Sequence, residues 1–366
     1  MHIWFAASIS PTAYGGVHRS IMQLAAELRR YGHTTEIIFS KHHSQHWLRF
    51  SFRLALRLIL RFWRRPSWII ARSSDGLIST FVIRMFRMRA RVALHSHGWE
   101  ERVTELERRL PSLLITNPTT WRARLIGFAL LRCMLERASL CICGTIDEAR
   151  WVRGKYHYSR SKVTVIPNGV DYTASPFWPS QTERPPSFLM VGGFTWKKNL
   201  EYGVELFRRF LEIEPAARLF IVGYGQLPEQ KRRYLFSLGD AVFTVESEAP
   251  GKMERWYESC PMLLFPSRYE GGRPFTILEA QSRGCIVFAT DIASTRECII
   301  SGVTGFFLAG VNPVADVNLI ETTYRNPDVM HTIGKNAWRK AMRNRSQRQG
   351  KRCARILLMN MTGRKK

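Results

Sequence analysis

The residue types best suited to chemistry gather in one stretch, Phe265 to Gly284. The apolar run MLLF (Met262–Phe265) predicts a buried parallel strand, and Glu270, two glycines and Pro274 follow it. From Phe275 the apolar residues recur at helical spacing, so the stretch predicts a strand, a glycine loop and the start of a helix. Outward-facing amides and the helix dipole at such a start favour a phosphate group. The stretch therefore predicts an anion-binding site.

Two carboxylates flank this predicted anion site. Glu270 lies in the loop, and Glu279 lies in the second turn of the helix. Carboxylates repel phosphate, but they accept hydrogen bonds from hydroxyl groups. A pyrophosphate on the amides, with sugar hydroxyls bonded by carboxylates on either side, describes a nucleotide-sugar. The same residues also fit an ordinary strand–helix unit with surface glutamates, and the local pattern leaves both interpretations open.

The first half of the chain offers a second group of polar residues. HIWFA (2–6) predicts a strand, SISPTAYGG (8–16) a loop of small residues, and the following apolar periodicity a helix. Gly15-Gly16 would allow a ligand to approach the backbone, or would simply make a turn. His95 and His97 stand two apart at the end of another predicted strand, so they point to one face. For these histidines an acid–base role and a merely structural role both remain open.

Strands and helices alternate through both halves of the chain, which predicts an α/β protein with two parallel sheets. The proline-rich segment 173–187 reads as a linker between them. We therefore predict a first domain over 1–172, a second over 188–326 and a helical, basic tail over 327–366. Two such domains would face each other across a cleft, with the ligand bound between the carboxyl ends of their strands.

Residues 47–65, WLRFSFRLALRLILRFWRR, differ from the rest of the chain. Arginines recur every four residues among aromatic and aliphatic side chains, and no acidic residue occurs. The pattern predicts a helix lying in a membrane interface, with arginine on lipid phosphates. An amphipathic helix packed on its own domain is the alternative. The predicted membrane contacts are Trp47, Arg49, Arg53, Arg57, Arg61 and Trp63.

The net charge and the composition of the chain limit the classes of binding partner. The net charge of +26 attracts polyanions, whether nucleic acid, an anionic membrane or phosphorylated substrates. Nucleic acid is disfavoured because the basic segment carries too much aliphatic surface and no reader motif is visible. The seven scattered cysteines lack metal spacing and indicate buried reduced thiols in a cytosolic protein. The N-terminus lacks the features of a signal peptide, and no apolar run is long enough for an ordinary membrane span.

The order of the motifs resembles that of the retaining glycosyltransferases of family 4 (glycosyltransferase group 1), over nearly the whole chain. The matching segments are YGGVHRSIMQLAAELRRYGH (14–33), LHSHGWEE (94–101), VIPNGVD (165–171), MVGGFTWKKN (190–199), IVGYGQ (221–226), SRYEGGRPFTILEAQSRGC (267–285) and TRECIISGVTGFF (295–307). Singly these segments are modest signals, but in this order they are highly specific. The resemblance implies the GT-B fold of two Rossmann-like domains facing a cleft.

The resemblance also implies a role for individual residues. His97 would lie near the reaction centre, Lys198 would neutralise the departing pyrophosphate, and Glu270 would contact the sugar hydroxyls. Glu279 would bind the ribose, and Gly16 would approach the donor phosphate and sugar. The remaining donor-binding residues would be Gly271, Gly272, Arg273, Pro274, Phe275 and Thr276. The family implies no cofactor and no metal, and the chain contains no Asp-x-Asp motif.

The chain departs from the family pattern at two places. The family usually carries an arginine where this chain has Gly193, so either one phosphate cation is missing or Arg273 or Lys197 replaces it. The family's two glutamates are usually separated by seven residues, whereas eight separate Glu270 from Glu279. We predict that Gly271-Gly272 absorbs the extra residue as a bulge and leaves Glu270 in the site.

These features together predict a glycosyltransferase that uses a nucleotide-diphosphate sugar, retains the anomeric configuration and needs no metal. The predicted acceptor is a saccharide that is lipid-linked or belongs to a lipopolysaccharide core. The predicted location is cytoplasmic, peripheral on the inner face of the cell membrane, since segment 47–65 favours an anionic membrane. A nucleotide-sugar epimerase of the same fold and a non-catalytic binder of saccharide or membrane are the alternatives.

Overall fold

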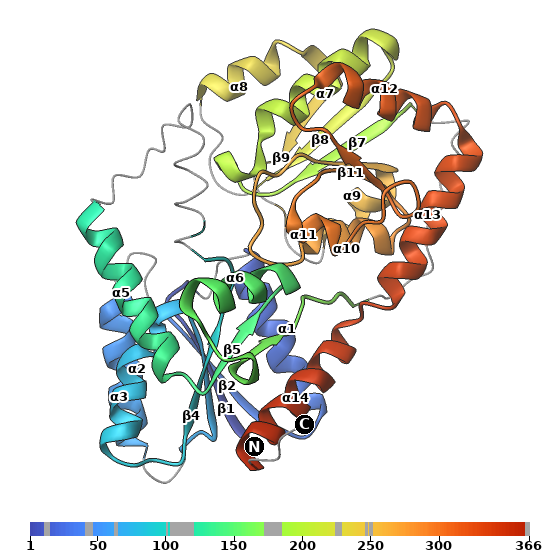
Figure 1. Cartoon of the computed structure of the whole chain (residues 1–366). Coiled ribbons are helices and arrows are strands. Elements are labelled where there is room, and N and C mark those ends of the chain that lie inside the picture. The colour runs from blue at the N-terminus through green and yellow to red at the C-terminus, as the bar shows by residue number, and fades with distance from the viewer. Residues whose placement is uncertain are drawn as a thin grey trace. The chain divides into compact units, whose positions relative to one another are not determined.

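The computed structural model describes residues 1–10, 15–40, 47–61, 65–99, 102, 121–171, 185–223, 229–245, 248 and 252–362. The chain forms two compact units (Figure 1). The first unit comprises Met1–Asn168 and Ser346–Lys366, and the second comprises Gly169–Arg345. Each unit is built on its own six-stranded parallel sheet, as the strand–helix alternation predicts.

The first unit's sheet has the strand order β2-β1-β3-β4-β5-β6. Its strands are β1 (His2–Ala7), β2 (Thr34–Phe39), β3 (Trp68–Arg72), β4 (Arg91–His95), β5 (Leu140–Cys143) and β6 (Val163–Val165). Every neighbouring pair of strands is parallel. For example, Ile3 of β1 pairs with Thr35 of β2 on one side and with Trp68 of β3 on the other.

Helices cover both faces of this sheet. α1 (Gly16–Arg30) and α14 (Ser346–Thr362) pack on the face that carries Ile3 and Phe5. The face that carries Trp4 is covered by α2 (Trp47–Leu60), α3 (Leu77–Met85), α5 (Trp121–Arg137) and α6 (Ile146–Tyr156). Burial on both faces explains why these strands read as continuous apolar runs rather than as alternating ones.

The second unit repeats this plan with the strand order β12-β11-β10-β7-β8-β9. Its strands are β7 (Ser187–Val191), β8 (Arg218–Val222), β9 (Val242–Val245), β10 (Met262–Phe265), β11 (Ile286–Thr290) and β12 (Phe306–Leu308). Its helices are α7 (Leu200–Ile213), α8 (Glu229–Phe236), α9 (Met253–Ser259), α10 (Phe275–Ser282), α11 (Ala293–Arg296), α12 (Pro313–Tyr324) and α13 (Pro327–Met342). Short 3₁₀ turns include Ser73–Gly76 in the first unit and Trp196–Lys198 in the second.

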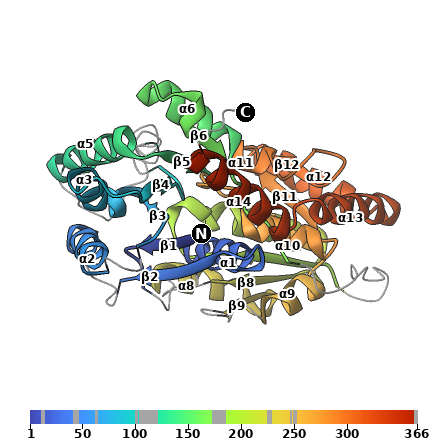
Figure 2. The ribbon, with the colours of Figure 1, turned by 90° about the horizontal axis from the view of Figure 1, so that it is seen from below.

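The last forty residues differ from the predicted separate tail. Their described part forms two helices, α13 (Pro327–Met342) and α14 (Ser346–Thr362), which divide between the two units. α13 buries Met330 and Ile333 in the core of the second unit, whereas α14 buries Cys353 and Leu357 in the first. Figures 1 and 2 show α14 beside α1. Apolar periodicity within the basic sequence explains the difference, because each helix has a face that must be buried.

The approach of α14 to α1 depends on one glycine. A Cβ atom on Gly350 would lie 2.3 Å from the Cβ of Glu27, so a side chain there would force the helices apart. Glu27 is itself buried and accepts hydrogen bonds from Arg30 at 2.7 Å and from the Ser346 hydroxyl at 3.2 Å. The two helices are therefore joined by close packing and by a buried polar contact.

The strand orders identify where ligands are expected. In the first sheet the connections run outward in opposite directions from β1 and β3, and in the second from β7 and β10. Open parallel sheets bind ligands at the carboxyl edge of such a switch point. The loops at the second switch point are those after Val191 and Phe265, and the latter begins the stretch that was richest in candidate residues. Within the described part of the chain, no helix is both long enough and apolar enough to cross a membrane.

Candidate active site

Lys198 and Glu270 meet at the carboxyl edge of the second sheet. Lys198 ends the 3₁₀ turn after β7, and Glu270 lies in the loop after β10. The lysine Nζ is 2.6 Å from the Glu270 Oε1, and the two side chains are only 25% and 17% exposed. The backbone also joins the two loops, because the Arg268 amide donates to the Lys197 carbonyl at 2.7 Å. Pairing of β7 with β10 thus brings together residues 72 positions apart in the sequence.

The position of Lys198 depends on Gly192. This glycine has a φ of +144°, which other residues rarely adopt, and a Cβ there would lie 2.8 Å from the Lys198 Cε. The lysine stem therefore lies directly against the backbone, and its Nζ is 5.1 Å from the centroid of the Phe265 ring. Asn199, with a φ of +51°, then turns the chain into α7. The ammonium group is held in place by packing as well as by its carboxylate partner.

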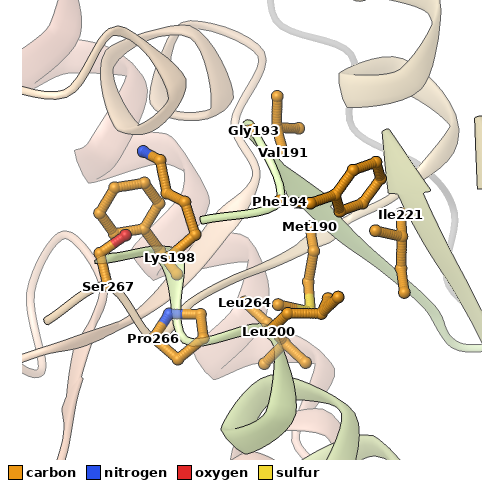
Figure 3. A pocket seen from close by; sticks show the side chains of 12 residues that line it. Met190, Val191, Gly193, Phe194, Lys198, Leu200, Ile221, Leu264, Pro266 and Ser267 are labelled. Atoms are coloured by element: carbon orange, nitrogen blue, oxygen red, sulfur yellow. The ribbon is translucent and has the colours of Figure 1, made fainter. Parts of the chain in front are cut away.

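A pocket lies beside this lysine (Figure 3). Its apolar wall is formed by side chains from β7, β8, β10 and the start of α7, and Lys198 and Ser267 lie on the same side of it. The Ser267 hydroxyl is buried and has no hydrogen-bond partner among the described residues. The lining residues are Met190, Val191, Gly192, Gly193, Phe194, Lys198, Leu200, Ile221, Leu264, Phe265, Pro266 and Ser267.

The start of α10 lies just after Glu270 in the chain. Pro274 is the N-cap residue and its ring supplies no hydrogen-bond acceptor, while the first turn of the helix contains no acidic residue. Gly271 and Gly272 lie in a bend, and neither has a positive φ. The partly buried Glu279 accepts a hydrogen bond from the Tyr257 hydroxyl at 2.9 Å. Phe275 is buried, and the half-buried Thr276 is the second residue of the helix.

Arg273 and Lys197 were the two candidates for the missing phosphate cation. The Arg273 Nε donates to Glu297 at 3.3 Å, and its Nη1 donates to the Asn344 Oδ1 at 3.0 Å. Lys197 has its Nζ 5.7 Å from the centroid of the Tyr269 ring. Arg273 is thus held by two side chains of its own unit, whereas Lys198 lines the pocket.

His97 belongs to the first unit and follows the end of β4. Its ring lies 4.2 Å from that of His95, centroid to centroid. Burial lowers the pKa of His95 to about 4, and burial, with His95 and Arg72 nearby, holds the pKa of His97 well below 6.5. The His97 Nε2 is buried and has no partner among the described residues. A neutral imidazole has one donor and one acceptor nitrogen, so the His97 Nε2 can donate or accept one hydrogen bond, depending on the tautomer.

Glu148 braces the turn that carries His97. Its Oε1 accepts a hydrogen bond from the Ser96 hydroxyl, and its Oε2 accepts one from the Gly144 amide at 2.7 Å. The Gly98 amide in turn donates to the Ser96 hydroxyl at 3.3 Å. Burial raises the pKa of Glu148 to about 7, although the bonds from Ser96 and Gly144 favour the ionised form. Glu148 therefore holds the 96–98 turn from within the core.

Gly16 begins α1, at the carboxyl end of β1. Gly15 is the N-cap in extended backbone and has no side chain to cap the helix, and the first turn has no acidic residue. Among the described residues, no group of three or more His, Cys, Asp and Glu side chains could hold a metal ion. Gly16 and His97 lie in the first unit, and the Lys198–Glu270 pair and α10 lie in the second.

Segment 47–65 forms α2 up to Leu60, and Trp63 lies outside the described residues. Arg49 and Arg53 are exposed, while Trp47 is half-buried. Arg57 and Arg61 both form ion pairs with Glu36 on β2, the latter at 3.0 Å. The arginines that were predicted to form one series thus differ, because two of them are held by a carboxylate of their own unit.

Four residues of these surroundings were not identified from the sequence. They are Gly192, Tyr257, Ser267 and Glu148. Of these only Glu148 had a local signal, since Thr145-x-x-Glu148 before an apolar helix is a capping-box pattern, and Thr145 does cap α6. Gly192 contacts Lys198 six positions further along the chain. Tyr257 and Ser267 became apparent only from contacts between separate elements.

Family models match most of the chain. Residues 14–174 match the model described as Glycosyltransferase Family 4, and residues 175–340 match the model described as Glycosyl transferases group 1. The two matches adjoin and together extend from residue 14 to residue 340. The chain therefore belongs to the group 1/family 4 glycosyltransferases of the GT-B type, and the predicted family is confirmed.

Similar proteins include the Vi polysaccharide biosynthesis protein VipC/TviE of Salmonella typhi, which is 31% identical over 121 residues. The putative glycosyltransferase EpsF of Bacillus subtilis (strain 168) is 28% identical over 183 residues. These matches cover 32% and 46% of this chain, respectively. They span 21% and 46% of the relatives, so the matched region is less than half the length of either protein.

Solved structures share the fold over almost the whole chain. Sucrose-phosphate synthase from Thermosynechococcus elongatus superposes with a TM-score of 0.77 at 17% identity, covering 99% of this chain and 100% of its own. Anabaena HepE, in a crystal structure in complex with UDP-glucose, gives a TM-score of 0.74 at 16% identity, covering 98% of this chain and 99% of its own. These likenesses confirm the predicted two-sheet GT-B class of fold.

The buried Glu148 should make stability depend on pH. Its pKa in the folded state, about 7, lies above the ordinary 4.5, so folding favours its protonated form. The stability that this group contributes is complete below pH 4.5 and is lost as the pH rises to 7, by about 3 kcal/mol at most. We expect Glu148→Gln to remove this part of the pH dependence, measured as unfolding free energy in urea.

His95 and His97 have the opposite effect on the pH dependence. Because burial favours their neutral form, the fold loses stability as the pH falls through 6.5. Both are unchanged in the variant, so the difference between variant and wild type isolates Glu148. Glu136→Gln, at an exposed position of α5, is the matched control. If the unfolding free energy of Glu148→Gln changed with pH as that of the wild type does, the raised pKa of Glu148 would be contradicted.

Proposed function

We propose that this protein is an enzyme that transfers a sugar from a nucleotide-diphosphate donor to a saccharide acceptor. The observation that carries the proposal is the Lys198–Glu270 pair at the β7/β10 switch point, followed directly by the start of α10. A cation and helix amides suit a pyrophosphate, and a carboxylate suits sugar hydroxyls. Membership of the glycosyltransferase family supports the proposal. HepE, which shares the fold, has structures in complex with UDP and with UDP-glucose.

In the proposed mechanism Lys198 exchanges partners when the donor binds. In the structure its ammonium group is neutralised by Glu270. A donor phosphate would share that ammonium group and leave Glu270 able to accept hydrogen bonds from the sugar hydroxyls. As the bond between the anomeric carbon and the phosphate oxygen breaks, negative charge grows on the phosphate. A fixed cation and oriented amides stabilise this charge without reorganisation.

We propose that transfer retains the anomeric configuration. The acceptor oxygen would form its bond on the face from which the phosphate departs, and the leaving phosphate would take the acceptor's proton. His97, which is neutral, would donate a hydrogen bond to the transferred sugar rather than carry charge. The amides of residues 271–276 would hold phosphate and sugar, Gly16 would let the donor approach, and Glu279, oriented by Tyr257, would bind the ribose hydroxyls.

The proposed acceptor is lipid-linked or belongs to a lipopolysaccharide core at the cytoplasmic face of the membrane. The exposed, basic and apolar surface of α2 supports this choice, because it suits a membrane that carries the acceptor. The likeness to a Vi polysaccharide biosynthesis protein also favours a saccharide acceptor. An epimerase of the same fold would instead convert the nucleotide-sugar with no acceptor present.

The donor can be tested without knowing the acceptor. In a thermal-shift panel, UDP-, ADP- and GDP-sugars are each compared with the free nucleotide. We expect the sugars of one nucleotide to raise the melting temperature of the protein. That donor is then incubated with the protein, first alone and then with lipid-linked saccharides from a bacterial membrane. The comparison distinguishes sugar transfer from epimerisation of the donor. Transfer of labelled sugar to the lipid fraction is expected. Conversion of the donor to its epimer without an acceptor would overturn the proposal.

The lysine is expected to contribute most to the transfer step. Lys198→Met should lower kcat by roughly 10²–10³-fold, since it removes the cation on the leaving phosphate and leaves Glu270 without its partner. Glu270→Gln should also lower kcat, through weaker contacts with the sugar. Lys335→Met, at an exposed position of α13, is the matched control. Undiminished turnover in Glu270→Gln would show that this glutamate has no role in transfer.

Glu279 is expected to act on binding of the nucleotide rather than on the chemical step. Glu279→Gln should weaken donor binding by roughly 10–100-fold, because charge-assisted hydrogen bonds to the ribose are lost. Tyr257→Phe should weaken it less, because it removes only the hydroxyl that orients the carboxylate. Calorimetric titration of the nucleoside diphosphate measures both variants. A fall in kcat with unchanged binding would contradict the ribose role.

Turnover is expected to persist without a divalent cation. Lys198 and the helix amides would provide the positive charge that a metal ion provides in other transferases. Initial rates measured after dialysis against EDTA, with and without added Mg²⁺ or Mn²⁺, test this expectation. A rate that vanishes with EDTA and returns with one cation would disprove metal independence.

A further inference from the structure

The outer side of α2 is apolar although its inner side is already packed. Phe50, Leu54 and Leu58 are buried in the core against the sheet. On the opposite side Phe52 is 60% exposed and Leu60 is 74% exposed. An amphipathic helix that only covers its own domain carries polar residues on its outer side. The sequence left packing and membrane contact as alternatives, and the structure shows that one face of α2 packs while another apolar face remains exposed.

α3 continues this exposed surface. Leu77 and Val82 join the same core cluster as the buried face of α2, and the two helices are packed together, as Figures 1 and 2 show. Because both helices bury residues in one cluster, their exposed sides lie away from the sheet. Phe81, Met85 and Phe86 are on that exposed side, with Met85 69% exposed. We call the exposed residues of α2 and of segment 81–89 the α2–α3 face.

Positive charge is distributed among these apolar residues. Arg49 and Arg53 are exposed on α2, and Arg84, Arg87 and Arg89 are exposed at the end of α3 and after it. Residues 41–99 contain twelve arginines and lysines and one acidic residue, Asp75, which is buried. Arg57 and Arg61 contribute less to this charge, because both pair with Glu36, whose carboxylate offsets one of their two positive charges. The remaining arginines carry charge on an otherwise apolar face.

We propose that the α2–α3 face docks on the surface of an anionic lipid bilayer. Aromatic and aliphatic side chains interspersed with arginines suit the acyl boundary and the lipid phosphates at once. A protein partner would favour a core depleted of charge, and nucleic acid would favour a surface with fewer aliphatic groups. This inference deepens the proposed function, on which its link to a lipid-linked acceptor rests. Docking itself requires neither donor nor acceptor.

Co-sedimentation with vesicles tests the proposal. The two probes are vesicles of phosphatidylcholine and vesicles of phosphatidylcholine mixed with phosphatidylglycerol. We expect binding only to the mixed vesicles, weakening as salt is added. Arg53→Gln with Arg84→Gln should weaken binding about 25-fold, at about fivefold for each arginine near an anionic surface. Phe52→Ser with Phe86→Ser should weaken binding to the same vesicles by removing the inserted side chains.

The exposed side of α14, in the same unit, supplies matched controls. Arg352→Gln with Arg355→Gln changes the net charge equally, and Leu358→Ser with Met361→Ser removes comparable exposed apolar groups. Both controls should sediment like the wild type. All these positions are exposed, and thermal unfolding should show that each variant folds. Donor stabilisation measured on the same variants should be unchanged, which separates docking from the proposed transferase activity.

Three results would overturn the proposal. Equal binding to neutral and mixed vesicles would remove the role of anionic lipid. An equal loss in the α14 controls would show that overall charge or apolar content, rather than this face, governs binding. Loss of nucleic-acid or protein binding in the α2–α3 variants, with vesicle binding intact, would assign the face to another class of partner.

Discussion

The pairing of buried parallel strands is the constraint on which the rest of this structure depends. A parallel sheet with helices on both faces directs all its carboxyl-end loops to a single edge. In the second unit the partners β7 and β10 are far apart in sequence, and their pairing brings the loop of Lys198 to the loop of Glu270. The ion pair is therefore a consequence of strand order and not of any local motif.

The side chains of Lys198 and Arg273 are held by different kinds of contact. Lys198 lies against the backbone at Gly192 and above the Phe265 ring, so its stem has little freedom. Its ammonium group contacts the Glu270 carboxylate, and in the proposed mechanism a donor phosphate shares that ammonium group. Arg273 is held differently, by Glu297 and Asn344 in its own unit. Among the described residues that line the pocket, Lys198 is the cation.

Much of the fold could be predicted because apolar runs and helical periodicity mark each element. The strand over 262–265 has the predicted bounds, and the strand predicted over 2–6 extends from His2 to Ala7. Strand order and long-range packing could not be predicted, since they arise from contacts between distant segments. Tyr257 with Glu279, Glu148 with Ser96, and α14 on α1 all belong to this class. The basic sequence of the last forty residues concealed two buried helical faces.

The place of α14 has a consequence for how the chain folds during synthesis. Domains generally fold from the N-terminus as they emerge from the ribosome. The first unit cannot do so completely, because Cys353 and Leu357 complete one face of its sheet and are made only after the whole second unit. Until then that face stays partly open beside α1. Completion of the first unit is thereby coupled to synthesis of the second, and a chain interrupted before residue 346 would lack one wall of its first core.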